Sequence, residues 1–267
     1  MKRLALFAHF DRDDRVRPHI VHHLQALKAL GATVHFISNS HLPESELSKI
    51  REWVDDIQLR ENTGLDFGMW KEGLARVQLA EWEEVVLTNS SVIGPIYPLE
   101  PIFERMAQAP CDFWAMTESW MCLHHFQSYF LVAKKRVLQS AAFKTFFESV
   151  LPYTDKKNII YSYELGLLAH LTQHGLQGSA AFPIADLKVS LLCRLLLAVR
   201  DGIRIPPRRR KKGSLNPTID QAQHLFEGGM PYIKIEILRN NPRGIWHAQL
   251  RRKIRQNPLA CALSQDL

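Results

Sequence analysis

The stretch RENTGLDFGMWKEGLARV, residues 60–77, carries the strongest local signal for the fold. Two glycines, Gly64 and Gly68, stand at the start of an apolar pattern with helical spacing. Further along, EEVVLTNSSVIGP joins an apolar strand to a polar tip, residues 88–91. This order of turn, helix, strand and polar tip is typical of open α/β sheets, which bind ligands outside the carboxyl ends of their strands.

The rest of the chain repeats the alternation of strands and helices. RLALFAHF predicts a first strand, followed by a helix that ends at Gly31 and by a second strand in TVHFIS. Further strands are predicted in DIQLR, CDFWAMT and SYFLVA, and further helices in LSKIREWV and over residues 67–79, 98–107, 135–150 and 163–174. The order predicts an α/β protein with helices on both faces of its sheet.

Length and composition limit the classes of protein to which the chain can belong. At 267 residues and 46% hydrophobic content, the chain can bury a substantial core. It has no unbroken apolar run of about 18 residues, which a membrane-spanning helix needs. His9 and Asp11 interrupt the apolar run of MKRLALFAHFDRDD, which favours a first strand over a signal peptide. The four cysteines form no CxxC pair, so we expect free thiols in the cytoplasm.

The net charge of +7 is concentrated in one segment, residues 187–212. Nine Lys or Arg and one Asp stand there, which leaves 25 basic and 26 acidic residues elsewhere. A nucleic-acid-binding domain more typically spreads its basic residues over one face, so nucleic acid is not an expected partner. The segment joins a leucine run to a polybasic end. Two interpretations stay open: a membrane-surface anchor, or a core-packed helix followed by a basic loop.

Nucleotide-sugar transferases of the GT-A type share the layout of residues 60–91, with an acidic Asp-x-Asp tip where this chain has Asn89, Ser90 and Ser91. The chain also resembles the rhamnan synthesis protein F family, GT-A-type rhamnosyltransferases of bacterial polysaccharide assembly. The resemblance spans roughly Leu4 to Leu238 and rests on six blocks in the family's order: RENTGLDFGMWKEGL, LTNSSVIGPIYPLEPIF, CDFWAMTES, HFQSYFLVAKKRVL, YSYELGL and GGMPYIKIEIL.

The resemblance implies a GT-A-like open mixed sheet in residues 1–184 and a C-terminal appendage, 185–267, which holds the basic segment and the block 228–238. It implies an inverting transferase that moves a deoxyhexose, rhamnose above all, from a nucleotide-sugar donor to a lipid-linked cell-surface polysaccharide. We expect a cytoplasmic protein, peripheral on the inner face of the membrane through residues 187–212. A non-catalytic glycan-binding or scaffold protein of the same fold is the alternative.

The resemblance also assigns the donor side of the site. The expected donor-binding residues are Asn62, Gly64, Asp66, Asn89, Ser90 and Lys234. Asp66 could equally be an N-cap carboxylate, and Lys234 could merely flank a strand. The family usually has an acid where Ser90 stands. We therefore expect Mg²⁺ or Mn²⁺ to bind only weakly, through Asn89 and Ser91.

On the acceptor side we expect Asp112, His125, Gln127 and Ser128, and Asp112 could also have a purely structural role. Adjacent histidines point to opposite faces of a strand, so His124 and His125 are not expected to bind a metal together. Inverting GT-A enzymes place an acidic base at the start of a helix after the acceptor-side strands. Glu164 has that position, although a first-turn Glu is also stabilised by the helix dipole.

Overall fold

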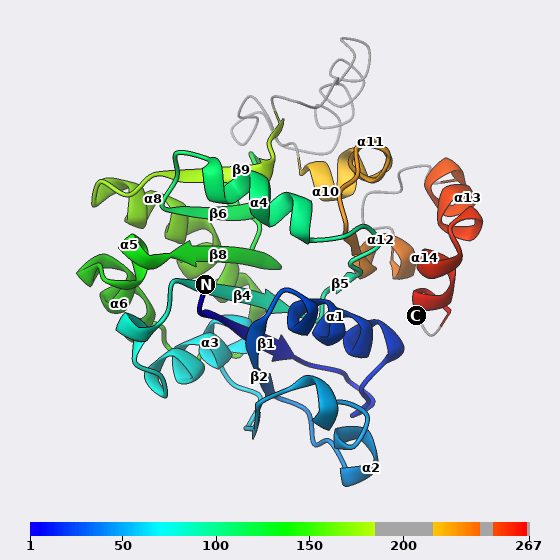
Figure 1. Ribbon diagram of the computed structural model, residues 1–267, viewed down its shortest axis with the longest axis horizontal. Coiled ribbons are helices and arrows are strands. Elements are labelled where there is room, and N and C mark those ends of the chain that lie inside the picture. The colour runs from blue at the N-terminus through cyan, green and yellow to red at the C-terminus, as the bar shows by residue number, and fades with distance from the viewer. Residues whose placement is uncertain (185–215, 241–247, 266–267) are drawn as a thin grey trace.

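The computed structural model describes residues 1–184, 216–240 and 248–265, in which strands and helices alternate (Figure 1). The strands are β1 (Arg3–His9), β2 (Ala32–Ser38), β3 (Asp56–Leu59), β4 (Glu84–Asn89), β5 (Val92–Ile93), β6 (Phe113–Ser119), β7 (His125–Phe126), β8 (Phe130–Lys134), β9 (Gly178–Phe182) and β10 (Ile233–Lys234). The helices are α1 (Pro18–Ala29), α2 (Glu44–Leu47), α3 (Leu65–Ala75), α4 (Glu100–Gln108), α5 (Lys135–Leu138), α6 (Ala141–Glu148), α7 (Lys156–Ile159), α8 (Leu165–Gln173), α10 (Pro217–Asp220), α11 (Ala222–Glu227), α12 (Ile235–Arg239), α13 (Ala248–Gln256) and α14 (Pro258–Leu263), with the single turns η1 (Arg51–Trp53), η2 (Leu79–Glu81) and η3 (Ile160–Glu164).

One sheet forms the centre of the molecule, in the order β3-β2-β1-β4-β8-β6-β7 with β9 beside β6. β1 pairs in parallel with β2 and β4, whereas β8 runs antiparallel between β4 and β6. The expected α/β architecture, an open mixed sheet flanked by helices, is confirmed. Because β1, β2, β4, β6 and β9 all run in one direction, their carboxyl ends meet at one edge of the sheet, where β8 begins.

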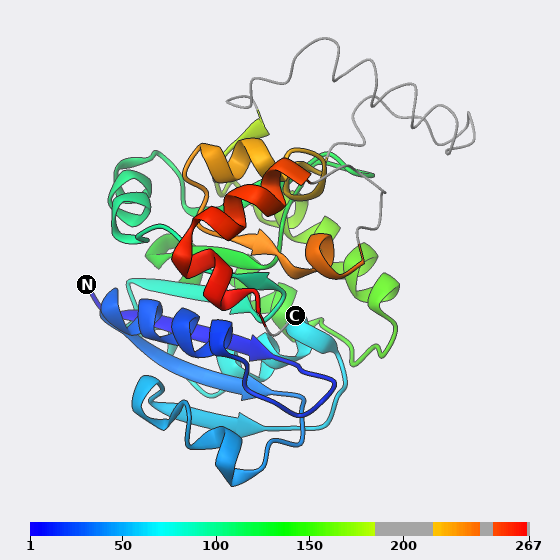
Figure 2. The ribbon, with the colours of Figure 1, turned by 90° about the vertical axis from the view of Figure 1, so that its right-hand side faces the viewer.

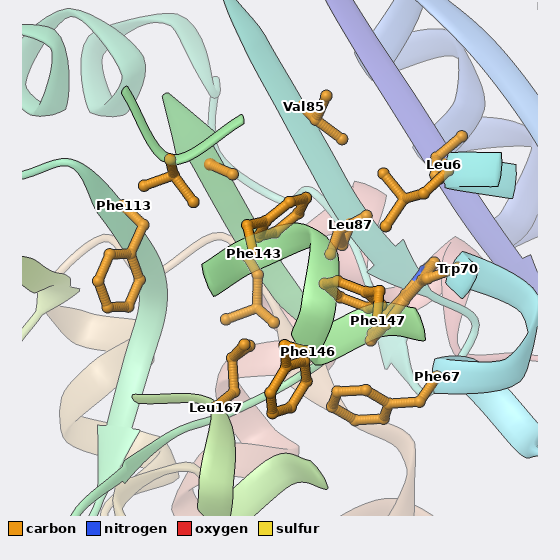
Figure 3. Close-up of a cluster of buried hydrophobic side chains, with 14 of the residues drawn as sticks. Leu6, Phe67, Trp70, Val85, Leu87, Phe113, Phe143, Phe146, Phe147 and Leu167 are labelled. Atoms are coloured by element: carbon orange, nitrogen blue, oxygen red, sulfur yellow. The ribbon is translucent and has the colours of Figure 1, made fainter. Parts of the chain in front are cut away.

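Side-chain alternation along the strands produces two cores, one on each face of the sheet. Leu6 of β1 faces α3, α6 and α8, whereas Phe7 faces α1 and α4. Figure 3 shows the first core, where Phe67 and Trp70 of α3 lie beside phenylalanines of α6. Every residue of β4 is buried, in agreement with its continuous apolar run.

The described residues 217–238 divide between two cores. Ile219, Phe226 and Ile237 form a separate apolar cluster with residues of α13 and α14 and with Ile96. Met230 and Tyr232 belong to the core on the α1 side of the sheet, and the Tyr232 hydroxyl lies 2.8 Å from Nε2 of His23 in α1. β10 pairs antiparallel with β5. Figure 2 shows the yellow-to-red helices α10, α11, α13 and α14 gathered along one side of the sheet. The division at residue 184 stays a prediction.

Several elements differ from the sequence-based expectation. The helix predicted over 135–150 is divided into α5 and α6, because the Ser140 hydroxyl caps α6 by accepting a hydrogen bond of 3.2 Å from the Phe143 amide. The helix predicted over 163–174 begins with η3, a π-helical turn. The short strands β5, β7, β9 and β10 were not predicted.

The basic segment 187–212, with both of its interpretations, lies outside the described residues. In the part of the chain that the structure describes, no helix is long and apolar enough to cross a membrane.

Candidate active site

The carboxyl edge of the sheet brings together residues that are far apart in the sequence. β4 ends at Asn89, and the antiparallel β8 begins at the same edge, directly after Gln127, Ser128 and Tyr129. The Thr88 hydroxyl donates a hydrogen bond of 2.8 Å to the Tyr129 carbonyl. The polar tip of β4 is therefore fixed against the segment that leads into β8.

The Asn89 side chain organises this tip. Its Nδ2 donates a hydrogen bond of 2.7 Å to Oδ2 of Asp66, at the start of α3. Its Oδ1 accepts hydrogen bonds from the Ser91 amide at 3.1 Å and the Ser91 hydroxyl at 2.6 Å. Both ends of this buried amide thus have partners. Asn89 fixes the Asp66 carboxylate and the Ser91 turn relative to each other.

Asp66 is not the N-cap of α3. Gly64 holds that position in the left-handed conformation, with φ 69°, and Leu65 follows with φ 46°. A non-glycine residue adopts such a φ only at a steric cost, and positions of this kind cluster at functional sites. Burial raises the pKa of Asp66 to about 6, and the negative charge of Glu164 acts in the same direction.

Glu164 is the last residue of η3 and holds the N-cap position of α8, so it lies at the start of that helix, as predicted, but after a π-helical turn that was not predicted. The Ser128 amide donates a hydrogen bond of 3.5 Å to its Oε1. Its charge affects the pKa values of Asp66, His125 and Lys234, so each of these three groups lies within electrostatic reach of Glu164. π-Helical turns are rare and frequently occur at functional sites.

Lys234 is held beside the tip by backbone pairing. It lies opposite Val92 in the β5–β10 ladder, and the next amide, of Ile235, donates a hydrogen bond of 3.1 Å to the Ser91 carbonyl. Its Nζ lies 5.6 Å from the centre of the Tyr129 ring. Burial lowers the pKa of Lys234, and the negative charge of Glu164 acts in the opposite direction. Among the described residues, Lys234 forms no ion pair with a carboxylate.

The other residues predicted for the donor lie at the same edge. The Ser90 hydroxyl accepts a hydrogen bond of 3.2 Å from the Phe10 amide, which joins the tip to the loop after β1. Asn62 is exposed and accepts a hydrogen bond of 3.1 Å from Asn39. Gly64 also has a packing role, because an added Cβ would lie 2.9 Å from the Gly68 Cα.

The residues predicted to bind the acceptor do not all lie at the same edge of the sheet. His125 in β7 is buried, which lowers its pKa, and its Nδ1 lies 2.8 Å from the Leu123 carbonyl. Gln127 is also buried, and its Oε1 accepts a hydrogen bond of 2.8 Å from the Thr218 hydroxyl. Gln127 therefore has an interior role in joining α10 to the sheet.

Asp112 lies at the opposite edge of the sheet, directly before β6. It pairs with Arg136 at 2.8 Å and accepts a hydrogen bond of 2.8 Å from the Gln177 amide. The structure therefore separates Asp112 from the other predicted site residues, and its contacts are those of a structural carboxylate.

Sequence reasoning did not single out the polar residues that follow β1, β2 and β3. His9 Nδ1 lies 2.9 Å from the Ser38 hydroxyl. The Asn39 side chain accepts a hydrogen bond of 2.8 Å from Arg60, whose guanidinium also pairs with Glu72. The signal was present in ISNS, residues 37–40, where a polar run ends an apolar strand as in TNSS. These groups extend the polar edge beside the tip of β4.

A divalent metal fits this tip poorly. The Asn89 amide oxygen already accepts two hydrogen bonds from Ser91, and the Ser90 hydroxyl contacts Phe10. Mg²⁺ and Mn²⁺ prefer charged carboxylate oxygens, and the carboxylate beside this tip, that of Asp66, already accepts a hydrogen bond from Asn89 and has a raised pKa. Within the described ranges, no group of three His, Cys, Asp or Glu side chains is arranged to hold a metal ion.

The chain is similar to several known proteins. The virulence protein VirA of Vibrio anguillarum is 31% identical over 230 residues, which cover 80% of this chain and 71% of VirA. The glycosyltransferase GlyE of Streptococcus pneumoniae aligns with 99% of this chain and 62% of its own, at 14% identity and a TM-score of 0.48. The mannosyltransferase PcManGT of Pyrobaculum calidifontis aligns with 97% of this chain and 73% of its own, at 12% identity and a TM-score of 0.41.

The model of the family described as rhamnan synthesis protein F matches residues 34–193, which include β2, the polar tip after β4 and Glu164. This match covers more than half of the chain, and VirA is a relative across most of it. The chain belongs to the rhamnan synthesis protein F family.

Proposed function

We propose that the chain is an inverting glycosyltransferase that moves a deoxyhexose, rhamnose above all, from a nucleotide-activated donor to a polysaccharide acceptor. Family membership supports a sugar transferase of polysaccharide synthesis. The observation that carries the proposal is the grouping of Asp66, Asn89, Glu164 and Lys234 at the carboxyl edge of the sheet. This edge is where open α/β sheets bind their ligands.

The donor diphosphate would lie between the tip of β4 and Lys234. Lys234 is a half-buried cation with no carboxylate partner in the described part of the chain, which is costly, and an anionic ligand would remove that cost. The N-terminus of α3 lies at the same edge, and its partial positive charge favours a phosphate there. Asp66, held by Asn89, and Asn62 would bind hydroxyl groups of the donor ribose or polar atoms of its base.

Glu164 would act as the general base. Its carboxylate accepts the proton of the acceptor hydroxyl while the hydroxyl oxygen forms a bond to the anomeric carbon of the donor. The bond from that carbon to the phosphate oxygen breaks on the opposite side, and its electron pair leaves with the nucleoside diphosphate. Lys234 would compensate the negative charge that develops on the departing phosphate, in surroundings where burial strengthens the interaction.

The acceptor and the location follow from the family rather than from the site. We infer that the acceptor is a lipid-linked cell-surface glycan. The protein would then work at the cytoplasmic face of the membrane, with residues 187–212 as the contact.

A non-catalytic glycan-binding or scaffold protein is the second candidate. The observation in its favour is the tip of β4, where Ser90 replaces the usual acid and its hydroxyl is engaged by Phe10. The retained Glu164, and the position of Lys234 within electrostatic reach of it, favour the transferase.

Nucleotide binding tests the proposal. Uridine and thymidine diphosphates, each titrated with and without EDTA, should raise the melting temperature of the wild-type protein, because they bind only the folded state. Lys234→Gln should weaken the affinity by about 10- to 100-fold, the size of a charge-assisted hydrogen bond. The matched control is Lys135→Gln, an exposed lysine paired with Glu83 after β8. A protein that binds neither diphosphate at millimolar concentration would contradict the donor site.

A further inference from the structure

An exposed pair of rings lies beside the proposed site, on the loop between β6 and β7. The side chain of Trp120 is 47% exposed, and that of Leu123 is 56% exposed. The Trp120 indole is stacked on the His124 imidazole, with ring centroids 4.4 Å apart and an interplanar angle of 13°. His124 Nε2 in turn lies 2.6 Å from Oε2 of Glu118 in β6. The indole is thus held against a ring that is itself fixed to the sheet.

The loop that carries these rings is tightly ordered by its own contacts. The Met121 amide donates a hydrogen bond of 3.1 Å to the Ser119 hydroxyl, and the Leu123 carbonyl lies 2.8 Å from Nδ1 of His125. Cys122 has a φ of 73°, in the left-handed region that non-glycine residues rarely adopt. Backbone strain of this kind persists only where the surroundings fix the chain, and it clusters at binding sites. Trp120 is therefore presented to solvent in a defined orientation.

The ring pair also adjoins a cavity, and its loop follows the carboxyl end of β6, at the edge of the sheet that carries the proposed site. The cavity, of about 490 Å³, is lined by Glu118 and His124 and extends between α8 and β9. Ser119, directly before Trp120, pairs with His125 in the β6–β7 ladder, and His125 lies within electrostatic reach of Glu164. A ligand on the indole would therefore have both the cavity and the site edge within its reach.

We propose that Trp120 and His124 form a platform that binds a sugar unit of the acceptor glycan, an inference that rests on the proposed transferase function. The C–H face of a sugar ring is apolar and packs on an aromatic face, and its hydroxyl groups need polar partners at the ring edge. Glu118 and His124 supply such partners beside the indole. A neutral saccharide matches this combination, because the described lining of the adjoining cavity contains no Lys or Arg that would attract an anionic ligand.

Binding of a purified rhamnan oligosaccharide tests the platform. Trp120→Ala should weaken its affinity by about tenfold or more, as truncation of a central aromatic contact does, and Trp120→Phe should retain most of it. Leu259→Ala, an exposed apolar residue of α14, is the control and should bind as the wild type does. All variants should bind nucleoside diphosphate normally, since Trp120 does not contact the proposed donor groups.

The outcomes distinguish failure of the proposed saccharide platform from failure of the proposed transferase function. Equal saccharide affinity in Trp120→Ala and the wild type would overturn the platform. So would a wild-type protein that binds nucleotide but no saccharide, and in both cases the transferase would stand. Saccharide binding that depends on Trp120, in a protein that binds no nucleotide, would support the platform and contradict the transferase.

Discussion

At the scale of one residue, the Asn89 side chain joins the end of β4 to the start of α3 by its hydrogen bond to Asp66. Its place after an apolar strand predicts a polar tip, which the structure confirms. Its partner Asp66 lies 23 residues away in the sequence, so only the fold shows that the two side chains are joined. Gln127 is the converse case: its place in the block HFQSYFLVAKKRVL implied contact with the acceptor, but its side chain is buried and accepts a hydrogen bond from Thr218. Residue type alone cannot reveal burial.

At the same scale, Asp66→Asn should stabilise the protein at neutral pH while weakening nucleotide binding. The folded-state pKa of Asp66, about 6, lies above the ordinary value of 3.8. Ionised Asp66 therefore destabilises the folded state above pH 6, and this penalty disappears as the pH falls towards 3.8. Asn can still accept the hydrogen bond from Asn89. The rise in melting temperature should be clear at pH 8 and absent at pH 4.

Denaturation of the wild type and of Asp66→Asn at several pH values measures this difference. An increase in stability that is the same at all pH values would show that the Asp66 charge does not cause it. A destabilised variant at pH 8 would contradict the raised pKa itself.

At the scale of elements, the long apolar strands β1 and β4 were predictable because burial on both faces leaves a continuous apolar run. The two-residue strands β5, β7 and β10 were not, because their pairing depends on a distant partner rather than on a pattern of their own. The π-helical turn before α8 likewise has no sequence period that distinguishes it from an α-helix. These elements position Lys234, His125 and Glu164, so the site was predicted less well than the fold.

The contribution to stability of the contact between residues 228–238 and α1 can be measured by removing one hydroxyl group. Tyr232→Phe removes the buried hydrogen bond of 2.8 Å to His23 and leaves a buried imidazole nitrogen without a partner. It should lower the free energy of unfolding by about 1–3 kcal/mol. Tyr161→Phe, in which the ring is 63% exposed, is the matched control and should change it by less than about 0.5 kcal/mol. If urea denaturation gave the same change in the free energy of unfolding for both variants, the buried hydrogen bond of Tyr232 would be contradicted.

At the scale of the whole molecule, three buried histidines make the fold sensitive to acid. Burial lowers the pKa of His9 and His19 to about 4 and that of His23 to about 3, from an ordinary value of 6.5. The unfolded chain therefore takes up protons near pH 6.5 that the folded chain cannot bind. The free energy of unfolding should fall between pH 6.5 and 4, by up to about 1.4 kcal/mol per pH unit for each histidine.

Urea denaturation at several pH values from neutral to acid checks this loss of stability. The control is His174→Gln, because His174 is exposed and its replacement should leave the dependence of the free energy of unfolding on pH unchanged. The raised pKa of Asp66 opposes the loss in part, since that carboxyl group takes up its proton more readily in the folded state. Stability that stays constant through this range would contradict the neutral, buried state of the three histidines.

The transfer reaction of Glu164→Gln tests the central claim most directly. Gln keeps the shape and can still accept the hydrogen bond from the Ser128 amide, but it cannot take a proton from the acceptor. Release of nucleoside diphosphate from a nucleoside-diphosphate rhamnose, measured with a rhamnan acceptor, should fall by about 10²- to 10⁴-fold in kcat. Nucleotide affinity and melting temperature should stay close to those of the wild type. A variant that transfers the sugar at the wild-type rate would contradict the assignment of Glu164 as the base.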